Sequence, residues 1–255
     1  MAGRPELLIR PEIPVYDDPA VERAVRKQHL AGAFRVLGRL GFENGTAGHA
    51  AVRDPDHPEW FWTNPFGMPF RRISADALLL VDTDGNVVEG EGIVNRAAYA
   101  IHSRVHAARP DVSASVHMHP TAGLAWAALG RELAPITQDA CAFYGDHVVY
   151  DQYAGPVLDL AEGESIGRAL GRRKAMILRN HGLLTVGQTI DEAAWWMVRL
   201  DRCCQVQLMA EAAGAPVCIP HQLALDGARQ LGTPHAGWFS FQPLLADLDD
   251  EPGPA

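Results

Sequence analysis

The residues best suited to chemistry in this chain are histidines, and His117 and His119 stand two positions apart. Side chains two apart on a β-strand share one face, so both imidazoles can approach one metal ion. The same spacing also occurs in pairs of surface or hydrogen-bonded histidines. His181 follows the apolar run 175–178, within a polar turn that ends in Gly182. This is where α/β sheets place functional groups, although the turn could simply need its glycine.

The elements that position these histidines are predicted from the spacing of apolar residues and from turn and cap signals. Helices are predicted over residues 21–40, 95–108, 121–129 and 191–213, the last opened by a capping box of Thr189 and Glu192. Strands are predicted over residues 50–53, 60–63, 78–81, 112–118 and 175–178, with a hairpin signal at Asp84-Gly85. The interleaved strands and helices predict one layered α/β domain with a central sheet.

Composition excludes several classes of protein. Of the 255 residues, 47% are hydrophobic and 21% are charged, as in a soluble globular domain. The net charge of −9 disfavours a nucleic-acid scaffold and an anionic membrane surface as partners. Four cysteines without C-x-x-C spacing favour free thiols in a reducing compartment. With neither a secretory signal nor an apolar run of membrane length, the sequence leads us to expect a cytoplasmic protein.

Five motifs follow one another between residues 45 and 184. They are Gly45-Thr46-Ala47-Gly48-His49, Thr63-Asn64-Pro65-Phe66-Gly67, and the segments 101–111, 117–120 and 178–184. Together they resemble the class II aldolase and adducin-head family. The resemblance implies a three-layer α/β/α fold with a central mixed or antiparallel sheet. We expect an N-terminal arm over residues 1–20, this domain over 21–245, and an acidic flexible tail over 246–255.

The resemblance also implies a cofactor and an assembly. It implies one divalent metal ion per subunit, either Zn, Mn, Fe(II) or Co, held by His117, His119 and His181. Three neutral imidazoles suit an open site with positions left for water or substrate. The family further implies a homo-oligomer, commonly a tetramer, with active sites near subunit boundaries.

The chain departs from the sugar-phosphate aldolases of this family in two places. Before the helix 95–108 those aldolases have Pro-Ser-Ser-Glu, in which the Glu is a metal ligand and acid/base group and the serines hold phosphate. Counting back from residues 109–111 places Ala98 at the Glu, and Arg96 with Ala97 at the serines. The first loop has Gly48-His49 where the aldolases usually have Gly-Asn. These differences disfavour a phosphorylated sugar as the substrate. The chain resembles the adducin-like branch of the family more closely than the aldolases.

Several other residues are candidates, each with a structural alternative. His49 could bind substrate or act as the acid/base group, or could be a loop residue. Arg96 could pair with a substrate carboxylate or be an exposed helix arginine. The remaining candidates lie in polar segments and could equally be loop residues: Asn64, Gln138 and Asp139 for substrate binding, and Tyr144 as a catalytic group.

Two further groups have uncertain roles. His102 and His106 are four apart on one helix face, a spacing that could bind metal, but packing or support of the site is the alternative. The aromatic residues between 60 and 70 could form either a core patch or an apolar wall for a larger substrate.

Three functions remain open from the sequence. The first is a metal-dependent carbon–carbon lyase, a decarboxylase or aldolase-like enzyme, acting on a non-phosphorylated oxo- or hydroxy-carboxylate, with aromatic acids among the candidate substrates. The second is a non-haem Fe(II) oxygenase that oxidatively decarboxylates an aromatic 2-oxo acid. The third is a non-catalytic adducin-like scaffold, which would have no need of the three ligand histidines.

Overall fold

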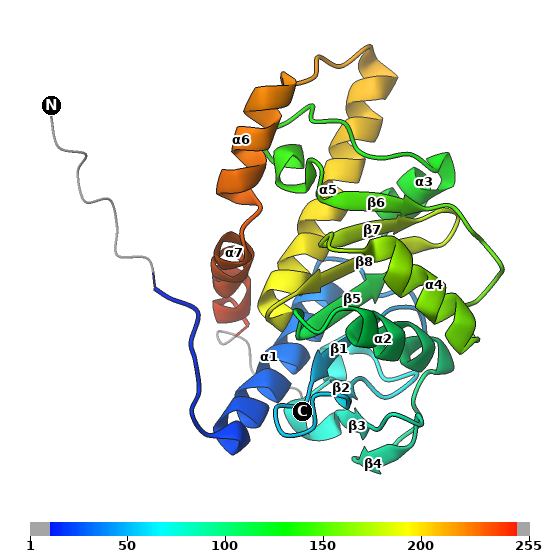
Figure 1. Ribbon diagram of the computed structural model, residues 1–255, viewed down its shortest axis with the longest axis vertical. Helices are drawn as coiled ribbons and strands as arrows, with labels where there is room; N and C mark the ends of the chain where they lie inside the picture. Colours follow the sequence, from blue (N-terminus) through cyan, green and yellow to red (C-terminus); the bar gives the residue numbers. More distant parts are fainter. Residues whose placement is uncertain (1–10, 249–255) are drawn as a thin grey trace, which may run out of the picture.

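The computed structural model describes residues 11–248. They form three layers, in which one central sheet lies between two layers of helices (Figure 1). The sheet has eight strands in the order β4-β3-β2-β1-β5-β8-β7-β6. Its strands are β1 (His49–Arg53), β2 (Phe61–Thr63), β3 (Leu79–Val81), β4 (Val87–Glu89), β5 (Ala114–Met118), β6 (His147–Tyr150), β7 (Ala175–Leu178) and β8 (Gly182–Gly187). Only β6 and β7 pair in parallel, so the sheet is mixed and the predicted fold class is confirmed.

The helices cover both faces of this sheet. They are α1 (Pro19–Arg39), α2 (Arg96–Ala108), α3 (Thr121–Leu129), α4 (Leu160–Leu170), α5 (Ile190–Ala213), α6 (His221–Leu231) and α7 (Pro234–Ala246). Residues of α1, α3, α5 and α7 form the larger core on one face, and α2 and α4 pack on the other (Figure 1). Within residues 11–248, none of the helices combines the length and apolarity that a membrane crossing requires.

Most predicted elements are present, and several others were not predicted. The predicted helices correspond to α1, α2, α3 and α5, and the predicted strands to β1, β2, β3, β5 and β7. The strands β6 and β8 and the helices α4, α6 and α7 were not predicted. Residues 1–10 of the predicted arm and 249–255 of the predicted tail lie outside the described residues. All four cysteines are free thiols, as expected.

The register between β1 and β5 decides which side chains face α2. His49 pairs with His117, and Ala51 pairs with Ser115, so these four side chains lie on one face of the sheet. The alternate residues, such as Val116, belong to the apolar core beneath α1 and α5. The two-residue alternation therefore assigns the polar residues of β1 and β5 to the α2 side.

Two glycines allow α4 to pack directly against α2. A Cβ atom at Gly163 would lie 2.1 Å from the backbone oxygen of Ala100, and one at Gly167 would lie 3.0 Å from Cβ of Ala108. Because no side chain separates the two helix backbones, α2 is held firmly over the sheet.

We therefore expect Gly163→Ala to lower the free energy of unfolding by about 2 kcal/mol or more, because the added methyl must push the helices apart. Urea denaturation followed by circular dichroism measures the change. Arg168→Ala is the matched control, since it changes an exposed position on the same helix. Equal stabilities of the two variants would contradict the role assigned to Gly163.

Candidate metal centre

His117, His119 and His181 converge at one end of the central strands of the sheet. His117 lies on β5, His119 directly follows β5, and His181 lies in the turn between β7 and β8. The ring centroids are 4.8 Å apart for His117 and His119, 4.7 Å for His117 and His181, and 5.0 Å for His119 and His181. One potential ligand atom from each residue lies within 4.8 Å of the other two. The predicted three-histidine group is therefore assembled within one chain.

The turn between β7 and β8 is shaped to bring His181 to this position. Asn180 has a φ of 58°, in the left-handed region that asparagine tolerates better than most residues. Gly182 is needed because a Cβ atom there would lie 2.7 Å from Cδ2 of His119 and 2.8 Å from the backbone oxygen of Met118. The absence of a side chain at Gly182 thus allows the close approach of the Met118 backbone and leaves room for the His119 imidazole.

The chemistry of the three imidazoles fits a divalent ion. Nδ1 of His117 donates a hydrogen bond to the backbone oxygen of Leu183 at 2.9 Å, which leaves the lone pair on Nε2 free. This Nε2 lies 2.9 Å from Nε2 of His119. This distance is that of a hydrogen bond between the two rings. The close approach of the two nitrogens shows that both imidazoles face the same point.

Burial keeps these imidazoles in the neutral form that a metal requires. Burial lowers the pKa of His117 well below its usual value, and lowers that of His119. For His181, burial and the neighbouring His119 lower the pKa to about 4. A neutral imidazole offers a lone pair without first losing a proton, so all three can bind metal near pH 7.

His49 and Asn64 lie at the same end of the strands as these three histidines. The His49 ring is 4.9 Å from the His117 ring, and burial, followed by the nearby His102, lowers the pKa of His49 well below its usual value. Asn64 is buried and directly follows β2, whose last residue Thr63 pairs with Ala51 near the start of β1. Of the predicted substrate and catalytic residues, His49 therefore lies beside a predicted ligand ring, and Asn64 lies at the end of the neighbouring strand β2.

The position of the missing carboxylate is also apparent. Ala98 is buried in the first turn of α2, one helical turn before His102. Among the described residues, the group of potential metal ligands contains the three histidines and no carboxylate.

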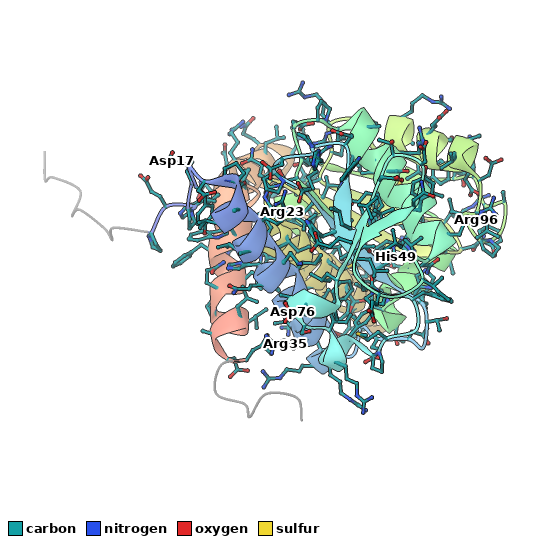
Figure 2. All side chains as sticks on the ribbon, turned by 90° about the horizontal axis from the view of Figure 1, so that it is seen from below. Asp17, Arg23, Arg35, His49, Asp76 and Arg96 are labelled. Atoms are coloured by element: carbon teal, nitrogen blue, oxygen red, sulfur yellow. The ribbon has the colours of Figure 1, made fainter. Side chains whose placement is uncertain are left out.

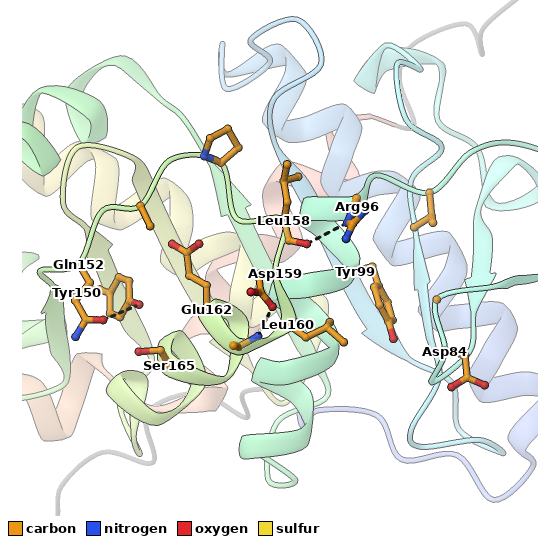
Figure 3. Close-up of a pocket in the computed structure, with 15 residues that line it drawn as sticks. Asp84, Arg96, Tyr99, Tyr150, Gln152, Leu158, Asp159, Leu160, Glu162 and Ser165 are labelled. Atoms are coloured by element: carbon orange, nitrogen blue, oxygen red, sulfur yellow. Dashed lines mark hydrogen bonds between the residues drawn. The ribbon is translucent and has the colours of Figure 1, made fainter.

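Arg96 lies away from the histidines within the chain. Figure 2 shows His49 inside the molecule and Arg96 at its outer rim. Nε of Arg96 donates a hydrogen bond to the backbone oxygen of Leu158 at 3.0 Å, beside an open cavity of about 1100 Å³ (Figure 3). Tyr99 and Tyr150 line the same cavity.

Gln138, Asp139 and Tyr144 also lie outside the histidine cluster. Gln138 is exposed, and Asp139 forms an ion pair with Arg199 of α5. The hydroxyl of Tyr144 is 2.8 Å from Nδ1 of His221. Tyr144 shortly precedes the start of β6, whereas His181 follows the end of β7. Because β6 and β7 are parallel, Tyr144 and His181 lie at opposite ends of the strands.

The predicted aromatic patch is distributed over both faces of the sheet, with Trp62 and Phe70 in the larger core. Phe61 lies on the opposite face, with its ring centroid 6.3 Å from that of His102 and 6.0 Å from that of His106. Phe66 is exposed. Most of the patch is therefore core packing.

Ser115 was missed in the sequence analysis and lies among these histidines. Its hydroxyl oxygen is 2.6 Å from Nδ1 of His102 and 2.9 Å from Nε2 of His106. The available signal was its position, because a polar residue two places before His117 on a buried strand must share the face of that ligand.

Comparisons with known proteins agree with this geometry. The family model described as "Class II Aldolase and Adducin N-terminal domain" matches residues 28–208. The chain belongs to this family. It is 48% identical to "Decarboxylase NovR" of Streptomyces niveus, over 91% of this chain and 86% of that protein. It is 47% identical to the "4-hydroxy-3-prenylphenylpyruvate oxygenase/4-hydroxy-3-prenylbenzoate synthase" of Streptomyces roseochromogenus subsp. oscitans, over 91% of this chain and 84% of that protein.

A solved structure also matches nearly the whole fold. It is the "L-fuculose 1-phosphate aldolase from Glaciozyma antarctica PI12", with a TM-score of 0.87 and 41% sequence identity. The match covers 93% of this chain and 94% of the solved one. Proteins similar to this chain thus carry names for different reactions.

We expect His119→Ala to reduce bound divalent metal from about one ion per chain to a small fraction, because two imidazoles hold an ion much less tightly than three. Elemental analysis by mass spectrometry measures the metal, and circular dichroism checks that the fold persists. His57→Ala is the control, since His57 is an exposed histidine stacked on Trp60. Full metal occupancy in His119→Ala would remove His119 from the ligand set.

Proposed function

We propose that this protein is a divalent-metal-dependent enzyme that cleaves a carbon–carbon bond in a non-phosphorylated oxo- or hydroxy-carboxylate, with release of CO₂ as the preferred reaction. The observation that carries the proposal is the donor set, in which three neutral imidazoles converge while Ala98 stands where the family's sugar-phosphate aldolases have their Glu. Aldol cleavage needs a base to move a proton, and the chain has no carboxylate at that position.

Decarboxylation suits the residues that are present. A divalent ion, when bound, polarises a carbonyl or carboxylate oxygen and favours enolate formation. If the carbonyl is β to the carboxylate, loss of CO₂ produces the enolate without prior removal of a substrate proton. The enolate then needs only one proton, and His49, beside His117, is the group placed to relay it. The hydrogen on the ring nitrogen that faces the substrate would pass to the enolate carbon, and a proton from water would replace it. The amide of Asn64 would orient the substrate.

A second candidate is favoured by the relative whose name includes an oxygenase and a benzoate synthase. Converting a 2-oxo acid into CO₂ and the shorter carboxylic acid removes two electrons, so this reaction needs an oxidant. O₂ is the oxidant that such an oxygenase name implies, and because O₂ accepts four electrons, a second two-electron oxidation of the same substrate would accompany the loss of CO₂. Three imidazoles with positions left open are compatible with Fe(II) in this role. The two candidates share a carboxylate substrate and differ in their need for O₂.

We further propose that Tyr144, Gln138 and Asp139 serve a site in a neighbouring subunit. The support is the position of Tyr144, at the end of the strands opposite His181 of its own chain. A homo-oligomer, as is common in this family, would bring the end of the sheet that carries Tyr144 to another copy's metal centre.

We expect the metal-loaded protein to release labelled CO₂ from aromatic oxo acids carrying ¹³C in the carboxyl group, and His49→Gln to lower the rate by about 100-fold. Mass spectrometry of the headspace measures CO₂ with Mn, Zn, Co or Fe(II), each with and without O₂. Release from a β-oxo acid without O₂ supports the lyase, whereas release from a 2-oxo acid that requires Fe(II) and O₂ supports the oxygenase.

L-fuculose 1-phosphate is the comparison substrate in this assay, since a structural relative is named for it. We expect no cleavage of this sugar phosphate. Rapid cleavage of L-fuculose 1-phosphate, with no turnover of any oxo acid, would overturn the proposed function.

Subunit mixing tests the position of Tyr144. We expect Tyr144→Phe and His119→Ala to be nearly inactive alone and to recover about a quarter of wild-type turnover when the two chains are co-assembled, because random mixing then rebuilds complete sites. Turnover is measured after refolding the two variants together. The control mixture is Tyr144→Phe with Tyr144→Phe/His119→Ala, which cannot rebuild a site. Absence of recovery in co-assembled oligomers would confine Tyr144 to a role within its own chain.

A further inference from the structure

A row of hydrogen-bonded side chains runs from the metal centre into the layer between the sheet and α2. Nδ1 of His49 lies 2.7 Å from Nε2 of His102, and Nδ1 of His102 lies 2.6 Å from Oγ of Ser115. Oγ of Ser115 in turn lies 2.9 Å from Nε2 of His106. We call these four residues the histidine row, and none of them is more than 3% exposed.

The row is assembled from three elements whose geometry is independently fixed. His49 and Ser115 lie on the α2-facing side of β1 and β5, as the strand register requires. His102 and His106 are one turn apart on α2, so both can point toward the sheet. The glycine contact between α4 and α2 holds that helix in place.

The surroundings make this row costly unless every polar atom in it is bonded. Phe61 packs against His102 and His106, and apolar clusters of the α2–α4 layer flank the row. A buried polar group without a hydrogen bond costs about 1–3 kcal/mol. Apolar side chains would fill the same layer without that risk, so packing alone gives no reason for four polar residues.

The hydrogens of the row are coupled to one another. Burial lowers the pKa of His102 and His106 well below the usual value, so each imidazole is neutral and has one N–H and one bare nitrogen. In one arrangement, N–H of His49 Nδ1 donates to His102, N–H of His102 donates to Ser115, and the hydroxyl of Ser115 donates to His106. His49 Nε2 is then bare.

In the second arrangement, each of these three bonds has the opposite direction. His106 donates to Ser115, Ser115 donates to His102, and His102 donates to Nδ1 of His49. The hydrogen of His49 then resides on Nε2. One hydrogen occupies each bond in both arrangements, so they differ in the function of His49 and not in its net charge.

We propose that His102, Ser115 and His106 are positioning residues that hold the His49 imidazole with Nε2 toward the metal centre and determine whether Nε2 presents a hydrogen or a lone pair. Nδ1 is engaged by His102, which leaves Nε2 as the nitrogen available to substrate. This inference rests on the proposed function of His49 as the group that delivers a proton.

The test breaks the row at Ser115, which contacts His102 and His106 and is separated from His49 by His102. Ser115→Ala removes the hydroxyl, and Ser115→Thr restores one. The matched control is Ser103→Ala, because the Ser103 hydroxyl on α2 donates to the backbone oxygen of Tyr99 at 2.6 Å and lies outside the row. His106→Gln breaks the row at its far end if Ser115→Thr does not fold.

Two measurements are made on each variant. ¹⁵N NMR of histidine-labelled, metal-free protein reports which nitrogen of His49 carries the hydrogen, with His49→Gln identifying its signals. Steady-state kinetics of the metal-loaded protein report kcat and KM. We expect one His49 tautomer in wild type, Ser103→Ala and Ser115→Thr, and a mixture of tautomers in Ser115→Ala and His106→Gln. We expect kcat to fall about tenfold or more in the latter two, with KM and metal content unchanged.

The outcomes separate this inference from the proposed function. An unchanged His49 tautomer in folded Ser115→Ala, or an equal change in Ser103→Ala, would overturn the positioning role. If the tautomer changes as expected while His49→Gln retains full turnover, the positioning role stands and the proton-delivering function of His49 fails.

Discussion

The antiparallel pairing of β1 with β5 is the constraint on which the rest of the site depends. It places His49 opposite His117 and Ala51 opposite Ser115. A shift of this register by one residue would turn the polar side chains of one strand into the apolar core beneath α1 and α5. The contacts among the ligands, His49 and the row all follow from this single alignment.

The alignment also explains how one face of the sheet can hold so many imidazoles. Their burial is tolerated because each has a defined partner: His117 donates to the Leu183 carbonyl, and His49 and His102 bond to each other. Burial then depresses their pKa values, so neutral rings lie close together without charge repulsion. Local packing therefore prepares the protonation state that a metal site requires.

Much of the fold and the convergence of the three histidines could be predicted from the sequence, because these depend on short-range patterns. Two-residue spacing on a strand identified His117 and His119, and the polar turn after β7 identified His181. The row could not be predicted, since it depends on which side of α2 faces β5. Likewise, the distance of Arg96 from the histidines follows from how its guanidinium lies against Leu158, which no sequence spacing encodes. The helices α6 and α7 were missed because the five motifs and the strongest periodicity both end before them.

The alanine at position 98 has a consequence for electrostatic balance. Three imidazoles are uncharged ligands, so a divalent ion among them retains its full formal charge, whereas an aldolase glutamate would cancel half of it. Such a centre would carry a net positive charge until an anion binds. A substrate carboxylate would neutralise part of this charge, and that carboxylate is the group that we propose is lost as CO₂. CO₂ departs as a neutral molecule and leaves the negative charge on the enolate, and protonation of the enolate then removes that charge. The product therefore lacks the anionic group that neutralised the ion, which weakens its retention and favours its release.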